Sequence, residues 1–154
     1  MLAGCAGPDL ARPSGSEAYW SGRLAVRVEG AERQSFSASF ELSGAAQQGR
    51  LKLLSPLGST VALIEWDATG AQVRGESETR RYRSLELLVE ESTGAPLPVR
   101  TLFDWLAGRN TQLPGWQADL SALSEGRLSA SRLAPTPPIQ LRLILDQGNR
   151  ARPD

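Results

Sequence analysis

The sequence predicts an α+β domain in which one curved antiparallel sheet carries a short helical cover. Three observations lead to this fold class. From residue 20 onward, apolar residues recur at every second position within short segments, a pattern typical of half-buried strands. Residues 84–108 change to helical spacing, and residues 139–146 return to strict alternation. Strands on both sides of a helical segment favour a sheet with helices packed on one face.

The first six predicted strands are short and are joined by tight polar turns, which indicates an antiparallel meander. WSGRLAVRVE (20–29) places its apolar residues at even positions and its charged residues at odd positions. QSFSASFELS (34–43) again has its apolar residues at even positions. The remaining strands of this half are expected at residues 50–54, 60–66, 71–75 and 78–84.

Two short amphipathic helices are expected next. Ser84 suits the N-cap of the first helix because its hydroxyl can accept a hydrogen bond from an unpaired backbone N–H. Gly94 suits the left-handed position that ends a helix. The segment PLP (96–98) is expected to break the chain between the helices. Pro98 suits the first turn of the second helix, since proline is favoured there. The second helix carries an apolar stripe at i, i+3, i+4 and i+7, formed by Val99, Leu102, Phe103 and Leu106.

The C-terminal part is expected to complete the sheet. Strands are predicted at residues 116–121, 126–133 and 139–146, with a proline-rich loop before the last of them. In IQLRLILD (139–146) every second residue is apolar, which indicates one buried and one solvated face.

Composition excludes several classes of function. The chain has 154 residues, no histidine, one cysteine and a formal net charge of zero. Without histidine and with one cysteine, Ser–His–Asp, Cys–His and HExxH chemistries are impossible within the chain. No phosphate-binding P-loop occurs, zero net charge gives no indication of nucleic-acid binding, and no two carboxylates can be placed in a common cleft. We therefore expect no enzyme, no cofactor and no metal. No apolar run approaches the roughly 20 residues of a membrane span.

The only cysteine, Cys5, lies in the stretch LAGC. This stretch resembles the lipobox of bacterial lipoproteins, in which the cysteine becomes lipidated and N-terminal. We expect residues 1–4 to be the remnant of a lipoprotein signal peptide and residues 5–17 a lipidated, flexible tether. Residues 18–147 then form the folded domain, and residues 148–154 a loose tail. The alternative for Cys5 is a chance thiol in a disordered segment.

A leucine stands where a turn is expected. In LLSPLGST, Pro56 fixes φ and Gly58 permits positive φ, so Leu57 lies at the tip of a turn. Turn tips usually carry polar residues, and the simple alternative is that Leu57 folds back onto the sheet.

Four stretches together resemble the LolB family, outer-membrane receptors that accept lipoproteins from the periplasmic carrier LolA. They are LAGC, YWSGRLAVRV, LLSPLGSTVALIE and PLPVRTLFDWLAGR, and they extend from residue 2 to residue 109. The last third of the chain matches less well. The resemblance implies an incomplete β-barrel with a helical lid and an apolar interior that holds acyl chains.

The resemblance also implies residue roles. Cys5 matches the lipidated anchor. Pro56, Leu57 and Gly58 match a protruding loop that helps deliver lipoprotein to the membrane. Our alternation analysis, independent of any motif, suggests which residues line the interior: Trp20, Leu24, Phe36, Phe40, Leu51, Leu53, Leu63 and Trp66 of the sheet, with Leu102, Phe103 and Leu106 of the lid.

The expected function is therefore a monomeric receptor, anchored at the periplasmic face of the outer membrane. Its partners would be a LolA-like carrier, lipoprotein acyl chains and the inner leaflet of that membrane. Two alternatives stay open at this point. One is a lipid-anchored assembly module with a filled core, and the other is a soluble LolA-like carrier. Whether the interior is a cavity or a filled core also stays open.

Overall fold

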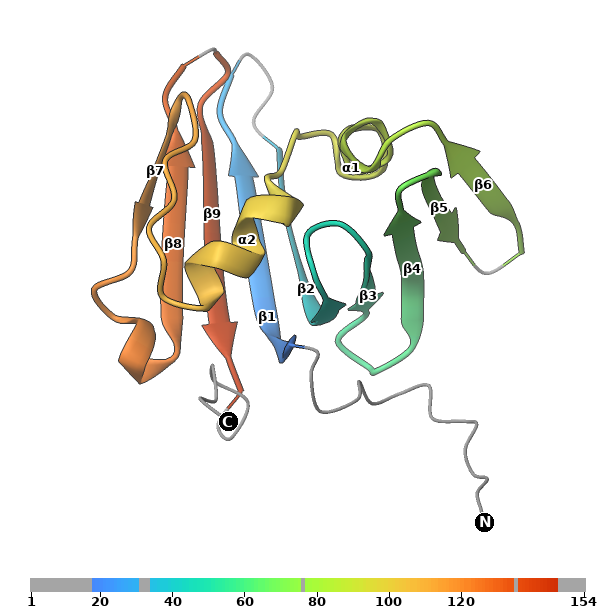
Figure 1. Cartoon of the computed structure of the whole chain (residues 1–154), viewed down its shortest axis with the longest axis horizontal. Coiled ribbons are helices and arrows are strands. Elements are labelled where there is room, and N and C mark those ends of the chain that lie inside the picture. Colours follow the sequence, from blue (N-terminus) through green and yellow to red (C-terminus); the bar gives the residue numbers. More distant parts are fainter. Residues whose placement is uncertain (1–17, 31–33, 76, 135, 147–154) are drawn as a thin grey trace.

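The chain forms one nine-stranded antiparallel sheet, seen in a computed structural model that describes residues 18–30, 34–75, 77–134 and 136–146. The strands are β1 (Ala18–Val28), β2 (Gln34–Gly44), β3 (Gly49–Leu54), β4 (Thr60–Asp67), β5 (Gly70–Arg74), β6 (Thr79–Tyr82), β7 (Trp116–Asp119), β8 (Arg127–Arg132) and β9 (Ile139–Leu145). Their spatial order is β6-β5-β4-β3-β2-β1-β9-β8-β7, so β6 and β7 are the two edges of the sheet. The sheet curves without closing (Figure 1). The predicted α+β fold with an incomplete barrel is confirmed.

Two helices between β6 and β7 cover one face of this sheet (Figure 1). Helix α1 (Leu85–Thr93) begins after Ser84, whose Oγ accepts a hydrogen bond from the backbone N–H of Leu87 at 3.2 Å. It ends at Gly94, which has φ = 81°. Helix α2 (Val99–Leu106) begins directly after Pro98, one residue later than predicted. We call the segment from α1 to α2, residues 85–106, the lid.

The alternation of apolar and polar residues along the strands gives the sheet one buried face and one exposed face. On β1, Leu24, Val26 and Val28 are buried, whereas Arg23, Ala25 and Arg27 are exposed. Strand β9 alternates in the same way over its full length. We call the face that carries the buried side chains the inner face and the opposite face the outer face. The lid lies over the inner face (Figure 1).

The C-terminal strands continue the sheet beside β1; the sequence predicted the strands themselves but not their pairing. Strand β9 pairs with β1 and β8 pairs with β9, and a short 3₁₀ helix (Leu123–Glu125) precedes β8. Strand β7 ends at Asp119, two residues before the predicted end. The carboxylate of Asp119 accepts hydrogen bonds from the backbone N–H and the hydroxyl of Ser121. These bonds turn the chain away from the β-ladder.

Three predicted features lie outside the described residues: the signal-peptide remnant, the tether with Cys5, and the C-terminal tail. Within the described ranges, no helix is long and apolar enough to cross a membrane.

Candidate functional site: the covered inner face

The inner face is a continuous apolar surface covered by the lid. It draws buried side chains from strands that are far apart in the sequence, because the antiparallel order brings β3, β2, β1 and β9 side by side. Its large buried members include Trp20, Val26, Phe40, Leu42, Ile64, Trp66, Ile139, Leu141 and Leu143. These belong to one continuous hydrophobic cluster with the buried side chains of the lid.

Phe103 of α2 lies between two tryptophans of the sheet. Its ring makes edge-to-face contacts with Trp20 at 6.0 Å and with Trp66 at 6.1 Å between centroids. Edge-to-face pairs at such distances are favourable beyond the area that they bury. Gly49 on β3 makes room for Trp66, since a Cβ there would lie 2.6 Å from the indole. In this closed arrangement the lid's own aromatic ring covers the centre of the inner face.

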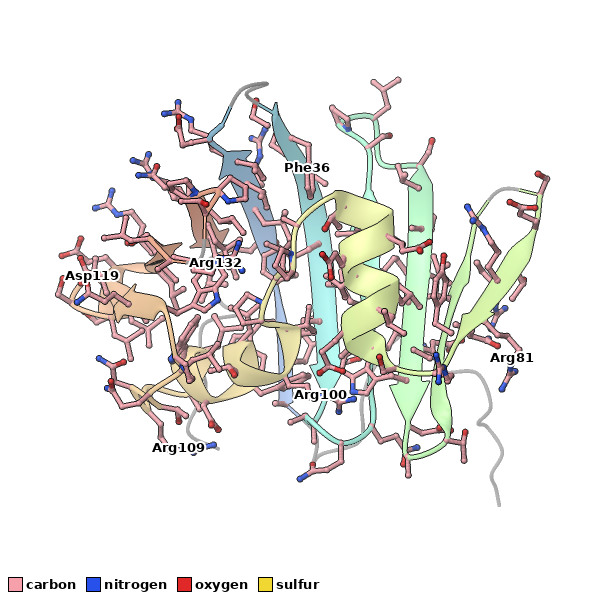
Figure 2. The ribbon with its side chains drawn as sticks, turned by 90° about the horizontal axis from the view of Figure 1, so that it is seen from above. Phe36, Arg81, Arg100, Arg109, Asp119 and Arg132 are labelled. Atoms are coloured by element: carbon pink, nitrogen blue, oxygen red, sulfur yellow. The ribbon has the colours of Figure 1, made fainter. Side chains whose placement is uncertain are left out.

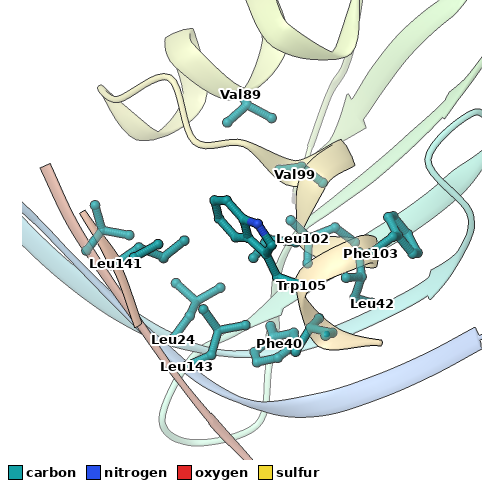
Figure 3. Close-up of a cluster of buried hydrophobic side chains, with 14 of the residues drawn as sticks. Leu24, Phe40, Leu42, Val89, Val99, Leu102, Phe103, Trp105, Leu141 and Leu143 are labelled. Carbon is teal, nitrogen blue, oxygen red and sulfur yellow. The ribbon is translucent and has the colours of Figure 1, made fainter. Parts of the chain in front are cut away.

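Trp105 is the second large lid side chain, and the sequence analysis did not select it. It is 1% exposed and lies in the middle of the buried cluster, near Leu24, Leu102 and Leu141 (Figure 3). Its indole N–H donates a 3.0 Å hydrogen bond to the carbonyl oxygen of Thr111. Trp105 does not belong to the predicted apolar stripe of α2 (Val99, Leu102, Phe103 and Leu106). The buried surface of the helix is therefore wider than the stripe predicted. The signal in the sequence that could have pointed to a buried Trp105 is a second tryptophan nearby, Trp116. In the structure the two rings lie 6.4 Å apart between centroids.

Most of the predicted interior residues lie on the inner face or on the lid side that meets it. Eight are buried: Trp20, Leu24, Phe40, Leu51, Trp66, Leu102, Phe103 and Leu106. Phe36 and Leu53 are half-buried and pack against the same cluster. Contact of these residues with acyl chains stays a prediction.

The prediction for Leu63 is wrong. Leu63 is paired with Lys52 and Arg74, whereas Ile64 is paired with the inward-facing Leu51. Because successive side chains of a strand alternate, Leu63 lies on the outer face together with its neighbour Glu65. The segment TVALIEW is apolar at odd and even positions alike, so its sequence does not indicate which positions face inward. In the structure Ile64 and Trp66, at even positions, are the buried ones.

A polar contact attaches helix α2 of the lid to the β2–β3 loop, while α1 is attached to β6 by a 3.3 Å hydrogen bond from the Tyr82 hydroxyl to Glu91. Arg100 of α2 donates from Nη1 to the carbonyl oxygen of Ala46, in the β2–β3 loop. The Nε1 of Trp66 donates to the same oxygen at 2.9 Å. Arg100 also pairs through Nε with Glu86 of α1 at 2.7 Å, which links the two helices. Partial burial raises the pKa of Glu86, but the hydrogen bond and charge of Arg100 outweigh it, so the pKa lies below its usual value.

One polar atom on the inner face has no partner. The indole N–H of Trp20 is buried and donates to no acceptor among the described residues. A buried donor without an acceptor is unfavourable, so this N–H is free to donate a hydrogen bond to an acceptor atom of a ligand in the interior.

The β3–β4 loop presents Leu57 to solvent. Leu57 is 93% exposed, the highest value among the large apolar residues of the described chain. The loop is shaped by other residues: the carbonyl oxygen of Ser55 accepts from the N–H of Gly58 at 2.9 Å, and Ser55 donates to Ser59 at 2.8 Å. Gly58 has φ = 92°, as the turn requires. The prediction that Leu57 lies at an exposed turn tip is confirmed, and its role in delivery stays a prediction.

An open sheet with an apolar face under a small helical lid is an α+β arrangement whose apolar interior can shield a hydrophobic ligand from water. A family model for the outer membrane lipoprotein LolB matches residues 18–136. The chain is 32% identical to the outer-membrane lipoprotein LolB of Bordetella petrii, over 96% of this chain and 87% of the relative. It is 33% identical to that of Cupriavidus pinatubonensis, over 84% of this chain and 65% of the relative. The chain belongs to the LolB family.

Proposed function

We propose that the chain is an outer-membrane lipoprotein receptor. It accepts lipoproteins from a LolA-like carrier, holds their acyl chains between the lid and the inner face, and inserts them into the outer membrane. The observation that carries this proposal is the aromatic and aliphatic inner face under a lid that is attached largely by apolar contacts. Membership of the LolB family supports the same function.

The energetics of the cargo require such a shield. Each buried methylene contributes about 0.8 kcal/mol, so one chain of about 16 carbons resists exposure to water by roughly 12 kcal/mol. A lipoprotein with several chains cannot cross an aqueous compartment unaided. Passage from a weaker to a tighter apolar site, and then to a bilayer, proceeds downhill, so neither a nucleotide nor a covalent step is needed.

Acyl chains reach the inner face by replacing the lid's own side chains. Phe103 and Trp105 occupy the middle of the interior in the closed arrangement. Outward movement of α2 exposes Trp20 and Trp66 to the incoming chain, and the chain's methylenes then take the place of the Phe103 ring. Among the described residues, the polar contact of α2 with the sheet side is the hydrogen bond from Arg100 to Ala46, and such limited polar attachment suits the movement. No catalysis is assigned to the protein.

The anchor and the delivery loop complete the proposal. Cys5 carries the lipid that holds the receptor at the periplasmic face of the outer membrane, and Leu57 enters the leaflet during delivery. The two alternatives are less favoured by the family. A LolA-like soluble carrier leaves the exposed Leu57 without a role, and an assembly module predicts a core that stays filled and binds no acyl chain.

A transfer experiment tests the proposed function. The 154-residue chain is mixed with a lipoprotein-loaded carrier, and the two proteins are separated to find which holds the lipoprotein. We expect the lipoprotein to move onto this chain and, when liposomes are added, into the membrane. A folded chain that leaves the lipoprotein on the carrier would contradict the proposal and favour the assembly module.

A further inference from the structure

The outer face carries a hollow that the proposed function does not use, and both polar and apolar atoms line it, those of Val26 and Phe36 included. Its floor is Ala25 in the middle of β1, where a small side chain stands among longer ones. The volume is about 400 Å³, and the wall is formed by Arg27, Ser35, Ser37, Gln140 and Arg142 from β1, β2 and β9. All six side chains are exposed on the outer face.

Strand register brings the two arginines to adjacent sides of this floor, Arg142 beside Ala25 on β9 and Arg27 two residues further along β1. Ala25 is paired with Arg142 on β9 and with Ser37 on β2, whereas Arg27 is paired with Gln140. Arg27 and Arg142 are therefore diagonal neighbours on one face, with Cα atoms about 7–8 Å apart. Two long guanidinium side chains at that spacing can converge on one group placed above Ala25.

The positive charge at the hollow is largely uncompensated. Arg142 forms no ion pair with any residue that the structure describes, and neither does Arg23, the next outward-facing residue of β1. Arg27 approaches Glu29 only at 3.7 Å, and 55% of its side chain stays exposed. The nearby carboxylate of Glu41 lies 3.7 Å from Lys52 instead. The zero net charge of the chain thus hides a local excess of positive charge.

A second hollow extends the first. It has a volume of about 580 Å³, shares Gln140 and Arg142 with the first, and continues over Ser129 and Ser131 of β8 toward β7. Its additional lining is uncharged except for Asp119 at the far end (Figure 2), and combines polar residues such as Gln117 with the apolar Trp116. An anion held by the arginines therefore has room for a polar substituent that points toward β8.

We infer that the hollow over Ala25 is a binding site for a phosphate-type oxyanion, either free or as a phospholipid headgroup. Guanidinium groups bind tetrahedral oxyanions through paired, charge-assisted N–H donors. The hydroxyls of Ser35 and Ser37 and the amide of Gln140 supply further donors around the same space. This site lies on the opposite face of the sheet from the acyl-chain interior, so it stands or falls independently of the proposed function.

The test compares two doubly substituted chains of equal charge. One carries Arg27→Gln and Arg142→Gln. The control carries Arg80→Gln and Arg81→Gln on β6, at the other edge of the sheet, where Arg81 is exposed (Figure 2). Inorganic phosphate is titrated into each chain while the backbone amide resonances of Ala25 and Ser37 are followed. We expect saturable shifts in the wild type and the control, and phosphate binding weakened about tenfold or more in the first variant.

A second arm identifies the source of the phosphate. Each chain is sedimented with vesicles of phosphatidylglycerol and with vesicles of phosphatidylcholine. A loss of phosphatidylglycerol binding in the first variant alone supports a headgroup site, and equal vesicle binding in both variants with phosphate binding lost in the first supports a site for free phosphate. Absence of a saturable shift in the wild type, or equal weakening in both variants, would overturn the inference.

Discussion

Leu57 holds its side chain in water although burial of a leucine side chain is worth about 1.5–3 kcal/mol. The loop gains nothing from this side chain, because Ser55 and Gly58 make the hydrogen bonds that shape the turn. An exposed apolar side chain on a well-defined turn suits insertion into a bilayer, where the lost burial is recovered.

We predict that Leu57→Glu separates delivery from folding. The free energy of unfolding should change by less than about 0.5 kcal/mol, since the side chain makes little packing contact. Acceptance of lipoprotein from the carrier should persist, and release into liposomes should fall. The two steps are measured by transfer from a loaded carrier, first without and then with liposomes.

Leu133 provides a matched control for this substitution. It is 70% exposed and follows β8, which runs in the same direction as β3, so both leucines lie at the same end of the sheet. Leu133→Glu should leave delivery intact. Loss of folding in Leu57→Glu, or equal loss of delivery in both variants, would show that the loop has no special role.

At the scale of elements, α2 combines an apolar attachment with one polar fastening. Its rings pack on Trp20 and Trp66, while Arg100 ties it to the β2–β3 loop and to α1. A lid that opens for cargo needs most of its attachment to be replaceable by the cargo. Acyl chains replace apolar contacts directly, whereas the Arg100 contacts must break or move with the helix.

We predict that Arg100→Gln loosens the lid. Stability should fall by only about 1 kcal/mol, as expected for a partly exposed ion pair. Hydrogen exchange of the α2 amides should accelerate, and uptake of a fluorescent acyl probe should become faster. Arg80→Gln removes an exposed ion pair between Arg80 of β6 and Glu78, which precedes that strand. This control should change neither the exchange rate in α2 nor the rate of probe uptake. Unchanged exchange in α2 would mean that the polar fastening does not control opening.

The same elements show what the sequence could and could not predict. Ser84, Gly94 and the alternation of β1 and β9 predicted their elements, because local caps and periodicity determine them. Leu63 was assigned to the wrong face because a strand that is apolar at both odd and even positions does not show which side chains point inward. Trp105 was missed because α2 is buried on more than one side, and that depends on the loop at Thr111 and on β7, which lie beyond any local pattern.

At the scale of the whole molecule, the absence of histidine determines how stability depends on pH. Histidine is the side chain whose ordinary pKa lies in the neutral range, so the free energy of unfolding should be flat between about pH 6 and 8. The carboxylates determine how the free energy of unfolding changes at acidic pH. Burial raises the pKa of Glu65 on the outer face, but hydrogen bonds from Arg74 and Gln72 and the charge of Arg50 outweigh it and lower the pKa overall.

The sign of this shift predicts acid destabilisation. A carboxylate whose pKa is lower in the folded state contributes stability above its unfolded pKa, and that contribution is lost as the pH falls through the folded value. Glu65→Gln should therefore reduce stability near neutral pH by about 1 kcal/mol. It should also flatten the decline below about pH 4. Denaturant unfolding of both chains across this range provides the measurement, and parallel curves would contradict the prediction.

The central claim is that acyl chains occupy the space between α2 and the inner face, and the chain's own tryptophans can report it. Trp20, Trp66 and Trp105 are buried there. A lipopeptide with brominated acyl chains, which quench tryptophan fluorescence on contact, is bound to the chain. We predict strong quenching that persists in Trp116→Phe, whose substituted residue is only half-buried near the β7 edge. Binding without quenching would place the acyl chains elsewhere and contradict the account.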